Sequence, residues 1–203
     1  MGTARMNTVK PWNSHRYTVV DVEGNGQRPP DLVEIAIVPI ENGTVGEPRS
    51  WLVNPPRPIT LMARRFHRIG DEEVAAASTV AEVADEIRKD LDDAVFVAHN
   101  AHVDLDVVTR SLPGFSPIEV VDTLKAARRL APGQVSYKLG NLVDAFGLAE
   151  GIAPDLRPHR AAYDAIVCAR LLVHLATSHS DPGLTLLGLL GKEEPDDPAP
   201  ALF

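Results

Sequence analysis

Apolar residues in the first quarter of the chain occur in short runs that are typical of β-strands. Tyr17 to Val22 is rich in β-branched residues and is followed by glycines at positions 24 and 26. Two further apolar runs, Leu32 to Ile40 and Val45 to Val53, are joined by the turn sequence Glu41-Asn42-Gly43. The pattern predicts three antiparallel strands at the start of the fold.

From position 79 onward the spacing changes to that of helices alternating with short strands. Within 79–91, apolar residues recur every three or four positions, and Ser78 or Thr79 is a suitable N-cap. The same reasoning predicts helices at 103–112, 124–130, 139–146 and 160–174, and strands at 94–98 and 118–121. Antiparallel strands followed by alternating helices and strands predict an α/β fold, with a mixed five-stranded sheet flanked by helices.

The length of 203 residues suits one well-buried domain. We expect it to span 17–180, after a polar extension at 1–16. The segment 181–203 is rich in acidic residues and proline toward its end, which predicts a disordered tail.

Charge and cysteine content narrow the class of protein only a little. A net charge of −8 argues against coating long stretches of nucleic acid, but not against gripping the end of a strand. No apolar run is long enough to cross a membrane, so no membrane partner is expected. The single cysteine, Cys168, cannot form an internal disulfide, which fits a cytoplasmic location.

Two carboxylates lie at the end of the first predicted strand. Alternation along a strand places Asp21 and Glu23 on the same face, where they could share a hard divalent cation. The same spacing recurs at Asp71 and Glu73, for which we predict no role. By itself the pair is better explained as a solvated strand end.

Two further clusters each combine histidine with an aspartate five residues later. His99 and Asp104 flank the junction of a predicted strand and helix, where α/β sheets collect functional groups. The alternative is that Asn100 caps this helix and Asp104 complements its dipole. His159 and Asp164 stand at the start of the longest predicted helix. Histidine is neutral near pH 7 and can accept a proton from water, although a capping histidine with a surface aspartate is the simpler reading.

In this order, the three clusters resemble the motifs of the DEDDh exonucleases, a family that includes the proofreading epsilon subunit of bacterial replicative polymerases. The similarity covers about residues 17–176. It includes Val53-Asn54-Pro55, His67-x-Ile69, Val121-Asp122-Thr123-Leu124 and Leu139-Gly140-Asn141-Leu142. The resemblance implies a ribonuclease-H-like fold and metal-dependent 3′→5′ exonuclease activity on DNA, of the proofreading or repair type. An exoribonuclease that trims short RNA is the alternative within the same class.

The resemblance also implies roles for individual residues. Two divalent cations, Mg²⁺ or Mn²⁺, would be held by the four carboxylates Asp21, Glu23, Asp104 and Asp164. His159 corresponds to the general base that deprotonates the attacking water. The contacts to the terminal nucleotide would come from Gly24, Asn25, Gly26, His67, His99 and Asn100.

The sequence departs from the family pattern at two places. Gly24-Asn25-Gly26 stands where the family often has Thr-Thr-Gly, and Val103 stands where it usually has phenylalanine. Both changes concern the substrate pocket, so the sequence leaves DNA and RNA open as substrates. A catalytically idle nucleic-acid-binding module is the alternative from another class, and the intact set of five catalytic positions argues against it.

Two segments outside these motifs carry further hypotheses. The segment 64–68 is basic and contains Phe66, for which we predict core packing rather than base stacking. The C-terminal residues 199–203 faintly resemble the short peptides that bind sliding clamps, without the usual glutamine. A sliding clamp is therefore a possible partner through the tail.

Overall fold

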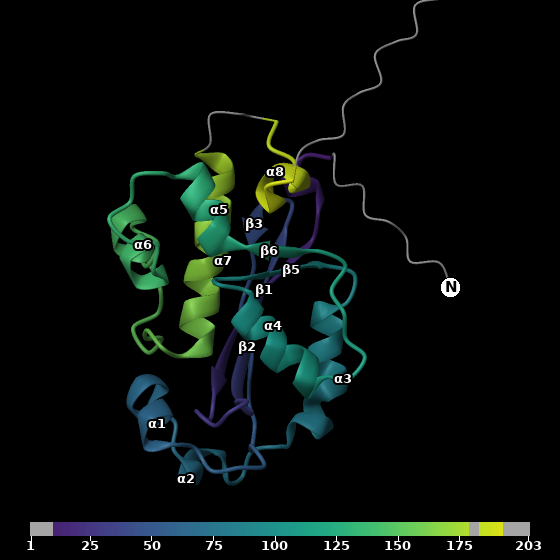
Figure 1. The fold of residues 1–203 in the computed structure, drawn as a ribbon, viewed down its shortest axis with the longest axis vertical. Coiled ribbons are helices and arrows are strands. Elements are labelled where there is room, and N and C mark those ends of the chain that lie inside the picture. The colour runs from purple at the N-terminus through teal and green to yellow at the C-terminus, as the bar shows by residue number, and fades with distance from the viewer. Residues whose placement is uncertain (1–9, 179–182, 193–203) are drawn as a thin grey trace, which may run out of the picture.

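The computed structural model describes residues 10–178 and 183–192, and a mixed six-stranded sheet forms its centre (Figure 1). The strands are β1 (Tyr17–Gly24), β2 (Leu32–Glu41), β3 (Thr44–Val45), β4 (Arg49–Leu52), β5 (Val95–Ala98) and β6 (Val120–Asp122). Their order is β3-β2-β1-β5-β6, and β4 also pairs with β2. β1 and β2 are antiparallel, whereas β1, β5 and β6 run parallel to one another. The predicted α/β architecture with a mixed sheet is confirmed.

The helices follow the predicted order along the second half of the chain. They are α1 (Leu61–His67), α2 (Asp71–Val74), α3 (Val80–Leu91), α4 (His102–Ser111), α5 (Thr123–Leu130), α6 (Leu139–Phe146), α7 (Ala161–Thr177) and α8 (Leu186–Leu190), with a short 3-10 helix at Trp12–Ser14. Thr79 is the N-cap of α3, and its backbone N–H donates to Glu82 Oε2 at 2.7 Å. Gly147 ends α6 in the left-handed conformation, as glycine commonly does.

Helices pack on both faces of the sheet. On one face, α7 and α8 bury apolar residues of β1, β2 and β5, and on the other face α3 and α4 do the same. A third apolar cluster joins α5 and α6 to α7, which places these three helices side by side (Figure 1). None of the helices in the described ranges combines the length and the apolar character needed to cross a bilayer.

The predicted third strand is divided into two. The prediction of one strand over 45–53 is wrong, because residues 46–48 are not paired in the sheet and separate β3 from β4. Pro48 lacks a backbone N–H, and Gly46 N donates to Pro39 O at 2.8 Å outside the regular ladder. The sheet therefore has six strands instead of five.

The helices α1 and α2 were not expected from the sequence. α1 buries only Ala63 and His67, so it lacks the apolar stripe that identifies a helix. The other large apolar residues of α1 face outward, and Phe66 is 57% exposed. The prediction that Phe66 packs in the core is therefore wrong.

Both ends of the domain extend beyond the predicted bounds of 17–180. Trp12 is buried in the cluster under α7 and α8, and its backbone N–H donates to Leu184 O at 2.9 Å. In the segment predicted as a tail, Leu186 and Leu189 are buried in the same cluster, because α8 presents them to it. The acidic stretch 193–203 lies outside the described residues, and with it the sliding-clamp hypothesis.

Candidate active site

The end of β1 presents two carboxylates to the face of the sheet covered by α7. Asp21 and Glu23 continue the alternation of Tyr17 and Val19, which are buried against α7. In the antiparallel register, Asp21 lies opposite Ala36 of β2 and Glu23 lies opposite Glu34. The small Ala36 side chain beside Asp21 is fully buried in the cluster that includes α7.

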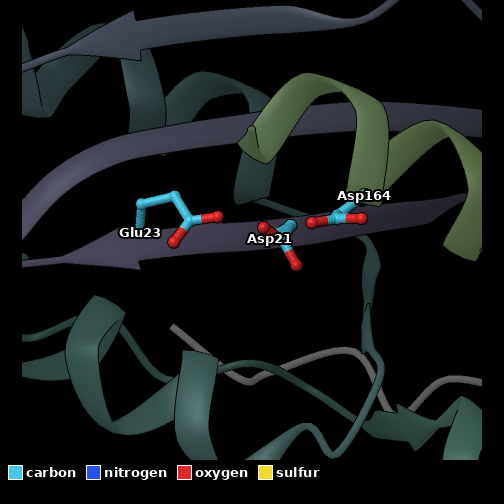
Figure 2. Close-up of side chains that lie close together, drawn as sticks. All are labelled: Asp21, Glu23 and Asp164. Carbon is cyan, nitrogen blue, oxygen red and sulfur yellow. The ribbon is translucent and has the colours of Figure 1, made fainter. Parts of the chain in front are cut away.

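Helix α7 brings a third carboxylate to the same place. Its residues Ala161, Ala165 and Ala169 are fully buried against the sheet, so small side chains allow a close approach of helix and strand. Asp164 lies in the first turn of α7, and its carboxylate points toward that of Asp21 (Figure 2). One oxygen from each of Asp21, Glu23 and Asp164 lies within 4.8 Å of the others.

The fourth predicted ligand, Asp104, adjoins this cluster without belonging to it. It lies in the first turn of α4, directly after β5, the parallel neighbour of β1. Asp104 Oδ1 accepts a hydrogen bond from the backbone N–H of Val22 at 3.1 Å. This hydrogen bond holds the Asp104 side chain against β1 at Val22, the residue between Asp21 and Glu23. The charge of Asp104 raises the pKa of Asp21.

His159 lies at the entrance to the cluster. Its backbone adopts a left-handed conformation with φ of 64°, and its N–H donates to Asp164 Oδ2 at 3.0 Å. The exposed imidazole packs edge-on to the ring of Phe66, with ring centroids 6.0 Å apart. A cavity of about 560 Å³ is lined by His159, Asp21 and Asp164 together with the start of α6.

Burial and repulsion by neighbouring carboxylates raise the pKa of the three clustered carboxyl groups and of Asp104. Loss of solvation is the largest cause for all four, and it raises the pKa of Glu23 to about 8 and that of Asp104 to about 7. The pKa of Asp21 lies well above its ordinary value, because Asp104, Asp164 and Glu23 add to the effect of burial. The pKa of Asp164 is also raised, and the N–H of His159 opposes the shift.

The chemistry of these donors fits divalent cations. The cluster offers only carboxylate oxygens, which are the ligands that Mg²⁺ and Mn²⁺ prefer. Each acidic group disfavours the ionisation of its neighbours, and bound positive charge would remove that penalty. The acidic cluster is thus compatible with metal binding.

Sequence reasoning missed two residues that support the cluster, Glu34 and Arg160. Glu34 is 5% exposed, and the guanidinium of Arg160 donates to both of its carboxylate oxygens. A glutamate inside the apolar run 32–40 was the signal that could have revealed it. Arg160 directly follows His159, the predicted general base, but only the fold shows the partner of Arg160.

The loop after β1, residues 25–31, begins with residues that are packed against the protein. Asn25 is fully buried, and its amide donates to Asp31 Oδ2 at 2.8 Å and accepts from Asp31 N at 2.9 Å. Gly26 has φ of 76° and lies against Thr60, where any Cβ would clash. Gly24 forms a bulge after Glu23. The Asn25 side chain therefore shapes the loop, and the contact of Asn25 with the terminal nucleotide stays a prediction.

The predicted substrate residue His67 is also buried. It is 2% exposed at the end of α1, and its Nδ1 accepts from Ile69 N at 3.0 Å. Burial lowers its pKa, against a smaller opposing effect of the Gly24 backbone. A neutral imidazole thus lies beneath the loop that follows Glu23.

His99 and Asn100 occupy a different wall of the site. Both ring nitrogens of His99 have intramolecular partners, Thr123 Oγ1 and Tyr137 O, each at 2.9 Å. Burial lowers the pKa of His99. Asn100 has φ of 68°, and its N–H donates to Asp122 Oδ1 at 3.1 Å. His99 therefore connects Thr123 to the loop that contains Tyr137. Asn100 lines the hollow on the other side of His99.

Comparison with known families identifies the class to which this fold and site belong. The model of the family described as Exonuclease (RNase T) matches residues 18–172, which contain every residue of the acidic cluster. The chain belongs to this exonuclease family and is an exonuclease-type phosphodiester hydrolase.

The curated relatives are bacterial nucleases and polymerases. The chain is 35% identical over 170 residues to 3′-5′ exonuclease DinG of Bacillus subtilis, covering 80% of this chain and 18% of that protein. It is 36% identical over 157 residues to Exodeoxyribonuclease 10 of Escherichia coli K12, covering 77% of this chain and 67% of the relative. Relatives such as DinG are thus much longer than the region they share with this chain.

Solved structures carry the same fold. Exonuclease X in complex with 5′ overhanging duplex DNA superposes with a TM-score of 0.67 and 34% identity, covering 80% of this chain and 91% of that one. Exonuclease I superposes with a TM-score of 0.68 over 83% of this chain and 42% of that one, at 18% identity, which speaks for the fold alone. The ribonuclease-H-like fold expected from the motifs is therefore confirmed.

Proposed function

We propose that the chain removes nucleotides from the 3′ end of a DNA strand by hydrolysis and releases nucleoside 5′-monophosphates. The observation that carries the proposal is the meeting of Asp21, Glu23 and Asp164 within 4.8 Å, beside Asp104 and at the foot of a cavity that His159 lines. A binding module would not need four carboxylates whose burial makes them costly to ionise.

Each residue has a defined task in this reaction. Asp21, Glu23, Asp104 and Asp164 would hold two divalent cations, Mg²⁺ or Mn²⁺. When bound, such cations stabilise the charge that develops on the entering and leaving oxygens of the phosphate. His159 would accept the proton of the attacking water at its imidazole, and its exposure allows that proton to pass to solvent.

The choice of DNA rests on the relatives. Exodeoxyribonuclease 10 is named for DNA, and the Exonuclease X structure contains duplex DNA with a 5′ overhang. A 5′ overhang leaves a recessed 3′ end, which fits removal of nucleotides from that end.

The test is digestion of single-stranded DNA and RNA of identical sequence with Mn²⁺, Mg²⁺ or EDTA. With a 5′ label, we expect a ladder of DNA products that shorten from the 3′ end and disappear in EDTA. With a 3′ label, the first product should be a labelled mononucleotide. Asp21→Asn, purified in parallel, provides the control for contaminating nucleases.

The alternatives give different results. Faster digestion of RNA would replace the DNA assignment with an exoribonuclease. Release of mononucleotides from the 5′ end would overturn the polarity. Absence of cleavage of either strand by folded protein would favour the nucleic-acid-binding module.

A further inference from the structure

A second hollow lies directly beside the catalytic cavity. It has a volume of about 590 Å³ and is bounded by α5, the loop 131–138 and the start of α6. His99, Lys138 and Leu139 line both hollows, so one continues into the other. We call the second hollow the α5–α6 groove. Its size is within the range of sites that hold small molecules or single nucleotides.

The α5–α6 groove differs from the catalytic cavity in charge. The catalytic cavity is lined by the carboxylates of Asp21, Asp144 and Asp164, with Lys138 where it joins the groove. The groove adds Arg128 to Lys138 and has no acidic side chain in its lining. In a chain with a net charge of −8, such a surface is unusual. It suits a ligand that carries negative charge along its length.

Neither Arg128 nor Lys138, the two cations of the groove, is neutralised by a carboxylate among the described residues. Arg128 and Lys138 are exposed, and neither forms an ion pair with a described residue. The neighbouring Arg129, in contrast, is engaged with the backbone oxygens of Gly188 and Leu189 at 2.7 and 2.8 Å. The guanidinium of Arg128 lies over the ring of Tyr137, 5.9 Å from its centroid. It is therefore held at the groove without being neutralised.

The wall of the groove is fixed to the catalytic centre. His99 Nε2 lies 2.9 Å from Tyr137 O, and the Tyr137 hydroxyl donates to Ala131 O at 3.2 Å. These contacts tie the loop 131–138 to the end of β5, next to Asn100. At the rim, Val135 is fully exposed and offers an apolar surface for a sugar or base.

We propose that the α5–α6 groove holds the nucleotides on the 5′ side of the scissile phosphate, with Arg128 and Lys138 contacting their phosphates. This inference rests on the proposed function and adds the path of the strand to it. Because the two hollows are continuous, one strand can pass from the groove into the catalytic cavity. The acidic cavity would hold the scissile phosphate through its cations, and the basic groove would bind the phosphates on its 5′ side. Because the groove has the size of a site for about one nucleotide, we expect its contacts to be complete within a tetranucleotide.

The test measures how KM depends on the length of the substrate. Oligodeoxynucleotides of two, four and ten residues are digested with Mn²⁺ by the wild type, by Arg128→Glu and by Lys89→Glu. Lys89 is exposed on α3, on the opposite face of the sheet, so it reproduces the change of charge away from the groove. Circular dichroism verifies that the variants are folded.

For the wild type, KM should fall from the dinucleotide to the tetranucleotide and then level off. In Arg128→Glu this fall should be lost, raising KM for the tetranucleotide about tenfold with kcat changed less than about threefold. For Arg128→Ala, the slope of log KM against log salt concentration should decrease by about 0.7, the value of one contact to a single-strand phosphate. Lys89→Glu should retain the length dependence of the wild type.

The outcomes separate this inference from the proposed function. Hydrolysis of p-nitrophenyl thymidine 5′-phosphate by the wild type tests the catalytic centre without the groove. If the wild type cleaves neither this ester nor any oligonucleotide, the proposed function fails. If it cleaves them but Arg128→Glu has the same KM as the wild type at every length, the strand does not pass through the groove.

Discussion

Arg160 forms a bidentate ion pair with Glu34, which lies opposite Glu23 of the acidic cluster on the neighbouring strand β2. Arg160 Nη2 lies 2.7 Å from Glu34 Oε1, Arg160 Nε lies 3.0 Å from Oε2, and the N–H of Ala161 donates to Oε2 at 2.9 Å. The pair fastens the first turn of α7 to β2. That turn carries Asp164, and His159 immediately precedes Arg160, so the pair sets the position of both relative to Asp21.

Removing Arg160 should destabilise the protein markedly. Arg160→Ala leaves Glu34 as a buried carboxylate without its counter-charge, and we expect a loss of about 3 kcal/mol in the free energy of unfolding. Urea denaturation at pH 7 measures it. Arg64→Ala, which breaks the exposed pair with Glu72, should cost less than about 1 kcal/mol. Equal losses in the two variants would contradict the anchoring role of Arg160.

Asp104 and Asp106 lie two residues apart on α4 and should behave differently. Asp104→Asn should abolish turnover, because Asp104 is buried beside Asp21 and is proposed to hold a cation. Asp106 pairs with Arg110 on the exposed side of the helix, so Asp106→Asn should remain within about twofold of the wild type. Steady-state digestion of labelled DNA compares them. Full activity of Asp104→Asn would remove Asp104 from the metal site.

Loss of the imidazole at position 159 should slow catalysis without abolishing cation binding. His159→Ala is expected to lower kcat by about 10²–10⁴-fold, which is the usual contribution of a positioned general base. His102→Ala provides the control, since His102 is exposed at the start of α4. Binding of Mn²⁺ followed by calorimetry should change little in either variant. A near-normal kcat for His159→Ala would show that another group accepts the proton.

Stability in EDTA should fall as the pH rises from 7 to 8.5. Glu23 and Asp104 have pKa values of about 8 and about 7 in the folded protein, well above their ordinary values, so the folded state retains protons that the unfolded state releases. Raising the pH through this window removes those protons and favours unfolding.

Thermal melts with and without Mn²⁺ measure this effect. The cation should raise Tm more at pH 8.5 than at pH 7, because it binds the ionised carboxylates. Glu23→Gln should flatten the pH dependence in EDTA. A Tm that is constant between pH 7 and 8.5 in the metal-free wild type would contradict the raised pKa values.

Asn25 distinguishes a structural role from a substrate contact. Asn25→Ala leaves the backbone N–H groups of Gln27 and Asp31 without their acceptor, so we expect a loss of about 1–3 kcal/mol in unfolding free energy. Urea denaturation measures the loss, and KM for the dinucleotide, read at a temperature where the variant is folded, should move less than about threefold. A large rise in KM with unchanged stability would restore the substrate contact inferred from the motif.

The sequence by itself determined the order of the main elements and the identity of the acidic residues. Helices such as α6 could be bounded correctly because apolar spacing and a terminal glycine are local signals. The spacing of Asp21 and Glu23 placed both on one face because alternation is a property of any strand. Local patterns and the order of the motifs therefore predicted the acidic residues of the site, but not how these residues are arranged in space.

Only the tertiary structure decided which groups meet and which are already engaged. The pairing of Glu34 with Arg160 spans 126 positions in the sequence, and no local pattern encodes it. The structure showed that the side chains of Asn25 and His99 form their hydrogen bonds within the protein, and that Phe66 is exposed and does not pack in the core. The folding of α8 onto the core depends on a surface built by α7 and Trp12. Contacts between distant segments arise from packing in three dimensions, where spacing along the chain carries no information.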